Sequence, residues 1–316
     1  MVLDPQVKAL LAKLAEQGLP STDEMSLPQA REAVFIFEEL EGEPQPVAQV
    51  RDLTIPGPAG ELPVRLYTPH SAPQGTRPTP LVVFFHGGGW VRGSVEIADR
   101  PCRALANDSG CTVASVEYRL APESKFPAAV EDCYAVVRWL AKHVGELDYD
   151  SERVAIAGDS AGGNLAAAVA LMARDRGGPP LSYQVLIYPA TDARGDYPSR
   201  QENAEGYFLT TRAMEWYWRH YLSDDASRDN PYASPLRAVD HSNLPPALIV
   251  TCEYDPLRDE GESYSEKLRE AGVPVKVSRY EGMIHGILWM GGIIDRTEDL
   301  IEEMSRELGV ALGTRE

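Results

Sequence analysis

Six short apolar segments alternate with helix-like segments along most of the chain, and this alternation constrains the fold more than any other feature. The strand-like segments are rich in β-branched residues and apolar on both faces: 81–85, 112–118, 153–158, 183–189, 247–255 and 275–280. Parallel strands that helices cover on both sides have this character. Helix-like segments lie between them, at 96–108, 127–143, 161–174, 259–271 and 292–309. We therefore expect an α/β protein with a mostly parallel central sheet flanked by helices.

Two regions depart from this alternation. Near the start, apolar residues at helical spacing predict one helix over about 3–14 and a second over about 27–39. Residues 47–68 favour an antiparallel hairpin with its turn at 57–60. A long interval between Pro189 and Leu248 includes the aromatic, helix-like stretch 211–222. A structureless loop of that length is uncommon, so this interval is expected to form an inserted helical cap.

The composition excludes several classes of protein. The 316 residues carry a formal net charge of −18, and no basic run offsets it, so nucleic acid is not an expected partner. No run of 18 apolar residues and no signal peptide occur, which argues against a membrane protein and favours the cytoplasm. Four scattered cysteines lack metal-ligand spacing and are expected to be reduced and buried: Cys102, Cys111, Cys133 and Cys252.

One strand-to-helix junction places a serine among glycines. In VAIAGDSAGG, Ser160 stands between Gly158 and Gly162, and Gly163 follows. The pattern G-x-S-x-G is that of a nucleophile elbow, in which a sharp turn holds a serine hydroxyl clear of a sheet. Because five letters also arise by chance, a plain turn is the alternative until other residues support the elbow.

A serine nucleophile requires a base and a carboxylate that orients the base. In α/β-hydrolases these follow in the order serine, acid, histidine, each in a loop after a strand. Asp255 ends the segment 247–255, and His285 follows the segment 275–280, so both the order and the positions agree. Asp259 is the competing acid, but its position favours a role at a helix N-terminus. We therefore predict the triad Ser160, His285 and Asp255.

When a serine attacks a carbonyl group, the tetrahedral intermediate carries an oxyanion, and backbone N–H groups that point at it can stabilise it. The segment 81–85 leads into His86, Gly87, Gly88 and Gly89, and such a glycine run after the third strand supplies an oxyanion donor in lipases and esterases. The N–H group of Ala161, directly after the serine, is the expected first donor. His86 could also be considered as a base, but its place in this loop favours a scaffold role for His86 and Gly87.

Five motifs together resemble those of the bacterial hormone-sensitive-lipase-like esterases, in the subgroup with Asp before the nucleophile. They are HGGGW (86–90), YRLAPE (118–123), GDSAGG (158–163), YDPLRDE (254–260) and IHG (284–286). The resemblance implies an α/β-hydrolase fold and oxyanion donors at Gly88, Gly89 and Ala161. It also implies a cap built from 1–45 and 190–245 on a core of 46–189 and 246–316. Two residues depart from the usual pattern, Ser124 and Ile287.

These features predict a carboxylesterase that hydrolyses small esters with short to medium acyl chains and requires no cofactor or metal. The acyl pocket is expected to be lined by six residues: Trp90, Tyr188, Tyr207, Leu209, Met214 and Ile287. Arg119 and Glu123 are expected to pair with each other or with backbone, and Asp159 is expected to lie behind the nucleophile.

Other functions use the same fold. An amidase, a deacetylase or a lactonase would need the same machinery, since the pocket selects the leaving group. A hormone-receptor-like binding protein would lack the base, whereas His285 is present. A lipase acting on aggregated fat would need a large apolar lid, but the expected cap is rich in charged residues. The sequence leaves the oligomeric state open, and a homodimer is compatible with it.

Overall fold

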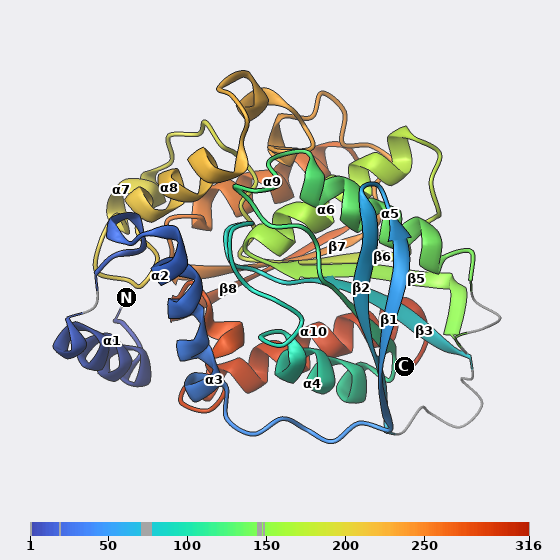
Figure 1. The fold of residues 1–316 in the computed structure, drawn as a ribbon, viewed down its shortest axis with the longest axis horizontal. Helices are drawn as coiled ribbons and strands as arrows, with labels where there is room; N and C mark the ends of the chain where they lie inside the picture. The colour runs from blue at the N-terminus through green and yellow to red at the C-terminus, as the bar shows by residue number, and fades with distance from the viewer. Residues whose placement is uncertain (1, 19, 71–77, 144–146, 148, 316) are drawn as a thin grey trace.

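A single mixed sheet organises the protein (Figure 1). The computed structural model describes residues 2–18, 20–70, 78–143, 147 and 149–315, and these include eight strands in the order β1-β2-β4-β3-β5-β6-β7-β8. β1 and β2 form an antiparallel hairpin, β2 is antiparallel to β4, and the remaining neighbours are parallel. The expected mostly parallel α/β architecture is confirmed.

Six strands lie where the apolar segments predicted them, and β1 and β2 form the hairpin expected over 47–68. Their bounds are β1 Gln49–Gly57, β2 Gly60–Thr68, β3 Thr79–Phe85, β4 Thr112–Val116, β5 Tyr149–Asp159, β6 Tyr183–Ile187, β7 Ala247–Tyr254 and β8 Val275–Ile284. Every residue of β3, β4 and β6 is buried, as expected for strands covered on both faces. The edge strand β8 is longer than predicted and reaches Ile284, so His285 follows it directly.

Helices cover the two faces of the sheet (Figure 1). α4 (Asp99–Ser109) and α10 (Arg296–Leu312) pack on one face. α5 (Ala128–Leu140), α6 (Ala161–Asp175) and α9 (Arg258–Glu270) pack on the other. α6 is buried along almost its whole length, because its Ala-rich sequence fits between the sheet and α5.

The N-terminal region contains α1 (Pro5–Gln17), α2 (Leu27–Glu32) and α3 (Ile36–Glu41). The single helix expected over about 27–39 is wrong, because a 3₁₀ turn at Ala33–Phe35 separates α2 from α3. Val34 and Leu40 would lie about 120° apart on a continuous α-helix. The interruption is accompanied by burial of both side chains.

The interval between β6 and β7 carries α7 (Pro198–Glu202) and α8 (Thr211–Tyr221). This interval and the N-terminal helices lie side by side at one end of the molecule (Figure 1), where Arg212 of α8 approaches Asp23 at 3.5 Å. Among the described residues, no helix is both long enough and apolar enough to cross a membrane.

The sheet register brings several loops to one edge. Phe85 pairs with Gly158, Asp159 pairs with Ile187, and Tyr254 pairs with Ile284. Because these strands are parallel, the loops that follow them start at the same level, at the carboxyl end of the sheet. Ser160, Asp255 and His285 each begin one of these loops.

Candidate active site

The turn at Ser160 has the geometry of a nucleophile elbow. β5 ends at Asp159, α6 begins at Ala161, and Ser160 between them has φ 54° and ψ −117°. A non-glycine residue in this region is strained, and such strain commonly accompanies function. Gly162 allows the close approach of α6 to the sheet, because a Cβ there would lie 1.9 Å from the carbonyl oxygen of Phe85. Ser160 is consequently held at the edge of the sheet and is 8% exposed.

Ser160, His285 and Asp255 form a continuous hydrogen-bonded chain. The Nε2 atom of His285 lies 2.9 Å from the Oγ atom of Ser160, and its Nδ1 atom lies 2.7 Å from the Oδ2 atom of Asp255. Asp255 is fully buried, and its Oδ1 atom accepts a hydrogen bond from the N–H group of Leu257 at 2.9 Å. Both carboxylate oxygens therefore have hydrogen-bond partners, and these contacts fix Asp255 beside the imidazole.

Asp259 does not contact the histidine. It lies in the first turn of α9, where it pairs with Arg258 at 2.8 Å and accepts a hydrogen bond from the N–H group of Ser199 at 2.8 Å. Asp259 therefore lies at the N-terminus of its own helix, as expected, and it also accepts from an N–H group at the start of α7.

The glycine loop after β3 adopts backbone conformations that favour glycine. Gly88 has φ 112° and Gly89 has φ 62°. A Cβ at Gly88 would meet the carbonyl oxygen of Arg92, and a Cβ at Gly89 would meet the ring of Tyr217 on α8. Ala161 begins the 15-residue helix α6, whose N-terminus favours negative charge. The roles of these three N–H groups as oxyanion donors stay predictions.

His86 is buried behind the glycine loop. Its ring stacks on Tyr118, and its Nδ1–H group donates to the carbonyl oxygen of Gly87 at 2.8 Å. The Tyr118 hydroxyl donates to the main-chain carbonyl oxygen of His86 at 2.7 Å. Burial lowers the pKa of His86 to about 4, so it is neutral at ordinary pH. These contacts hold the start of the glycine loop in place. The hydrogen bonds of His86 go to Gly87 and Tyr118 and not to Ser160.

Asp159 lies behind the nucleophile and ties two other loops to it. It is 1% exposed and accepts hydrogen bonds from the N–H group of Gly87 and the indole N–H group of Trp289, both at 2.7 Å. Burial raises the pKa of Asp159 to about 7, and both hydrogen bonds oppose that shift.

The residues expected to line an acyl pocket fall into two groups. Tyr207, Leu209 and Met214 lie in the interval between β6 and β7 and retain some exposed surface, so their role stays a prediction. Tyr188 packs its ring 4.5 Å from that of His285, centroid to centroid.

Trp90 and Ile287, by contrast, have no exposed surface. Trp90 stacks on Tyr221 and contacts Trp218, each with ring centroids 4.3 Å apart, and so joins the glycine loop to α8. Ile287 lies in the apolar core below the histidine loop. Neither side chain is exposed in this structure, and a role for these two residues in the acyl pocket stays a prediction.

Arg119 and Glu123, expected to pair with each other or with backbone, do not pair with each other, and Arg119 reaches the carbonyl oxygen of Ala128 at 3.5 Å. Arg119 forms two 2.7 Å hydrogen bonds with Asp132, a fully buried carboxylate on α5. Glu123 is largely exposed and pairs with Arg31 of α2 at 2.6 Å. Asp132 is the stronger partner because its buried charge requires compensation.

Several residues around the site carry no sequence motif of their own. Arg31 donates to the carbonyl oxygens of Val91 and Ala121 at 3.0 and 3.1 Å, which fixes α2 to the end of the glycine loop. Trp289 has the contact to Asp159 described above. Nothing in the spacing of these residues along the chain indicates that they meet.

This arrangement defines a class of protein: an α/β fold with a serine, a histidine and a carboxylate at the carboxyl edge of its sheet, as serine hydrolases have. Among the described residues, no group of three or more His, Cys, Asp or Glu side chains could hold a metal ion.

Comparisons with known proteins agree with this class. A family model described as the alpha/beta hydrolase fold matches residues 82–289. The chain is 41% identical to the carboxylic ester hydrolase LipN of Mycobacterium tuberculosis, over 97% of this chain and 83% of that protein. It is 39% identical to an arylesterase of Saccharolobus solfataricus, over 91% of this chain and 93% of that protein.

A solved structure is similar over almost the full length. A hyperthermophilic esterase from the archaeon Pyrobaculum calidifontis superposes with a TM-score of 0.91 at 44% identity, over 98% of this chain and 99% of that one. The chain belongs to the α/β-hydrolase family, and the resemblance to hormone-sensitive-lipase-like esterases is confirmed at this level.

Proposed function

We propose that this protein is a carboxylesterase in which Ser160 is the nucleophile, His285 the general base and acid, and Asp255 the orienting carboxylate. The observation that carries the proposal is the chain of hydrogen bonds of 2.9 and 2.7 Å that joins these three side chains at a strained elbow. Relatives named carboxylic ester hydrolase, arylesterase and ethyl acetate hydrolase support the choice of esters as substrates.

The geometry supports a two-step reaction. Ser160 Oγ attacks the ester carbonyl while His285 Nε2 accepts its proton, and the resulting oxyanion is received by the N–H groups of Gly88, Gly89 and Ala161. The ester C–O bond then breaks, and the imidazolium gives its proton to the departing alcohol. Water attacks the acyl-enzyme with the same base, releasing the acid and restoring the Ser160 hydroxyl. Asp255 stabilises the imidazolium in both steps.

We expect a preference for short to medium acyl chains. Each methylene that is buried against an apolar wall contributes about 0.8 kcal/mol, so the rate should rise with chain length at first. Tyr207, Leu209 and Met214 are the proposed wall, and the rate should fall once the chain extends beyond it.

A series of aryl esters from acetyl to palmitoyl, together with a matched aryl amide, tests this function. We expect the highest kcat/KM near butyryl to hexanoyl esters and slow amide turnover. An optimum at palmitoyl would favour a lipase, and faster amide cleavage would favour an amidase. Ser160→Ala is the control that separates the enzyme's turnover from background hydrolysis.

The four cysteines are buried and unpaired. This state fits a reducing compartment, and we propose the cytoplasm. A small ester is the proposed partner.

A further inference from the structure

The loop that carries the triad acid is held by side chains from the interval between β6 and β7. We call residues 255–257 the acid loop; it lies between the end of β7 at Tyr254 and the start of α9 at Arg258. Asn203, directly after α7, donates from its Nδ2 atom to the carbonyl oxygens of Asp255 at 3.1 Å and Glu253 at 3.3 Å. Asn203 is 3% exposed, so water cannot readily replace these bonds.

Ser199 provides a second attachment to the same loop. Its hydroxyl donates to the carbonyl oxygen of Pro256 at 2.9 Å, and its side chain is fully buried. The N–H group of Ser199 donates to Asp259 at 2.8 Å, and the N–H group of Asp259 donates back to the Ser199 hydroxyl at 3.2 Å. The start of α7 and the start of α9 are therefore bound to each other reciprocally.

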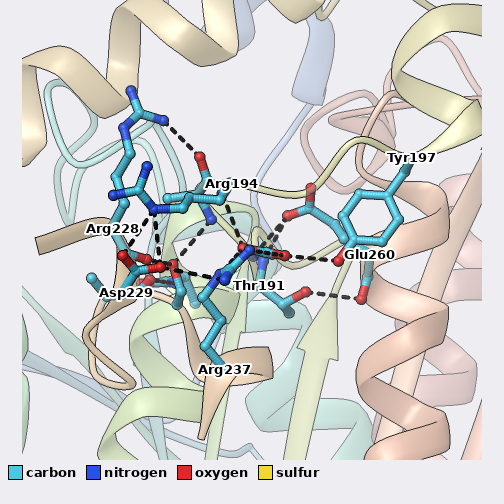
Figure 2. Close-up of polar contacts among 12 residues, drawn as sticks. Thr191, Arg194, Tyr197, Arg228, Asp229, Arg237 and Glu260 are labelled. Atoms are coloured by element: carbon cyan, nitrogen blue, oxygen red, sulfur yellow. Dashed lines mark hydrogen bonds and ion pairs between the residues drawn. The ribbon is translucent and has the colours of Figure 1, made fainter. Parts of the chain in front are cut away.

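A buried polar network joins α9 to α7, and Figure 2 shows the part of it around Glu260 and Thr191. Glu260 of α9 is fully buried and accepts hydrogen bonds from the N–H groups of Thr191 at 2.7 Å and Asp192 at 3.2 Å. It also pairs with Arg200 of α7 at 2.6 Å. Removing the partner of a buried carboxylate destabilises the folded protein, because the charge is then left uncompensated. The network therefore favours the position of α7 in which Arg200 contacts Glu260.

The acid loop is thus fixed from two sides. On one side, the pairing of Tyr254 with Ile284 ends the β7–β8 ladder one residue before Asp255 and His285. On the other side, Asn203 and Ser199 hold the main-chain carbonyl groups of the loop. The 2.7 Å contact between Asp255 and His285 lies between these two attachments.

We propose that Asn203 is a positioning residue for ester hydrolysis, acting by holding the acid loop so that Asp255 remains on the Nδ1 atom of His285. The inference rests on the proposed function and deepens it. It means that the interval between β6 and β7 contributes to the catalytic geometry as well as to the proposed acyl wall. Asn203 acts through Asp255 and does not touch the reacting atoms.

The test compares Asn203→Ala and Asn203→Asp with the control Gln201→Ala. Gln201 lies on α7, two residues before Asn203; its side chain is exposed, and its amide donates to the carboxylate of Asp196 at 3.2 Å. Asn203→Asp keeps the size of the side chain and removes both donors. Endpoint labelling with a fluorophosphonate counts the active sites in each preparation, so that kcat refers to correctly folded protein only.

We expect both Asn203 variants to lose about 10- to 100-fold in kcat per labelled site, because a small misplacement of a catalytic group has effects of this size. The loss should be the same for acetyl and hexanoyl esters, with KM within about threefold of wild type. For Asn203→Ala, which adds no charge, the acid limb of the kcat/KM profile should move to lower pH, because an imidazolium that lacks its carboxylate partner is less stable. A residue that serves only folding would reduce the number of labelled sites and leave these three readouts unchanged.

Three results would overturn the proposal. The Asn203 variants could match Gln201→Ala in kcat per labelled site; the pH profile of Asn203→Ala could stay at the wild-type position; or the loss in the variants could depend on acyl length, which would indicate a pocket role instead. If Asn203→Ala does not fold, Asn203→Asp and Ser199→Ala provide the same comparison. A wild-type protein that neither hydrolyses esters nor reacts with the fluorophosphonate would refute the proposed function itself, which is a different observation.

Discussion

Asp159 and Trp289 are joined by a 2.7 Å hydrogen bond from the indole N–H group to the carboxylate, deep inside the protein. Asp159 precedes the proposed nucleophile, and Trp289 lies in the short helical turn that follows His285. The other oxygen of Asp159 accepts from the N–H group of Gly87. One carboxylate therefore links the elbow, the glycine loop and the histidine loop.

Replacing Asp159 with Asn should change how stability depends on pH. In the unfolded chain an aspartate ionises near pH 4, whereas burial raises the pKa of Asp159 to about 7 in the folded protein. Between these values the folded state holds one proton more than the unfolded state, so its stability falls as pH rises. Asp159→Asn has no such proton.

Urea unfolding from about pH 4 to about pH 8 measures this effect. The stability of the wild type relative to Asp159→Asn should decrease towards about pH 7 and stay level above it, with a total change of roughly a few kcal/mol. If the stability difference between wild type and Asp159→Asn stays constant over this range, burial does not raise the pKa of Asp159 in the folded protein, because its hydrogen bonds offset the effect of burial.

Gly89 and Gly177 form a matched pair for testing the glycine loop. Their φ angles are 62° and 60°, but a Cβ at Gly89 would lie 2.2 Å from the Tyr217 ring, whereas nothing lies within 4 Å of one at Gly177. Gly89→Ala should therefore displace the loop and reduce kcat by about 100-fold or more, as loss of an oxyanion donor does. Gly177→Ala should cost only about 1–2 kcal/mol of stability, with kcat unchanged.

Steady-state kinetics and thermal unfolding of the two variants provide the comparison. Equal activity in both variants would show that Gly89 is not close to the reacting oxyanion.

The sequence indicated those parts of the site that lie next to recognisable local patterns. Ser160 lies at a strand-to-helix junction, and Asp255 and His285 lie directly after apolar strands, so parallel strand order alone brings them to one edge. The central strands were predictable because they are apolar on both faces, and the β1–β2 hairpin was predictable because its residues alternate between apolar and polar around a glycine turn.

Contacts that depend on tertiary packing were not predictable in this way. Arg119 pairs with Asp132 rather than Glu123, because α5 packs with its buried Asp132 carboxylate next to Arg119. The spacing of residues along the chain does not predict which helix packs there. The packing of Trp90 against Trp218 and Tyr221 of α8 could not be predicted from its position beside the glycines. Asn203 has no motif at all, and only the folded chain places it against the acid loop.

Asp255→Asn and Asp259→Asn should differ greatly in their effects. Of the two acids, only Asp255 contacts His285. An amide at this position would favour the wrong imidazole tautomer, and the same exchange in a serine protease costs about 10⁴-fold in kcat. At position 259 an amide oxygen can still accept from the N–H group of Ser199, so the loss should stay within about tenfold.

Parallel measurements of kcat at one pH decide between the two acids. Similar, mild losses in both variants would place the orienting acid elsewhere.

Fluorophosphonate labelling followed by peptide mass spectrometry identifies the serine that forms the acyl-enzyme. The hydrogen bond from Ser160 to His285 at 2.9 Å activates this hydroxyl, so wild-type protein should carry one adduct, on the peptide that contains Ser160. Ser160→Ala should carry none. An adduct on a different serine, or continued ester turnover by Ser160→Ala at the wild-type rate, would contradict the account.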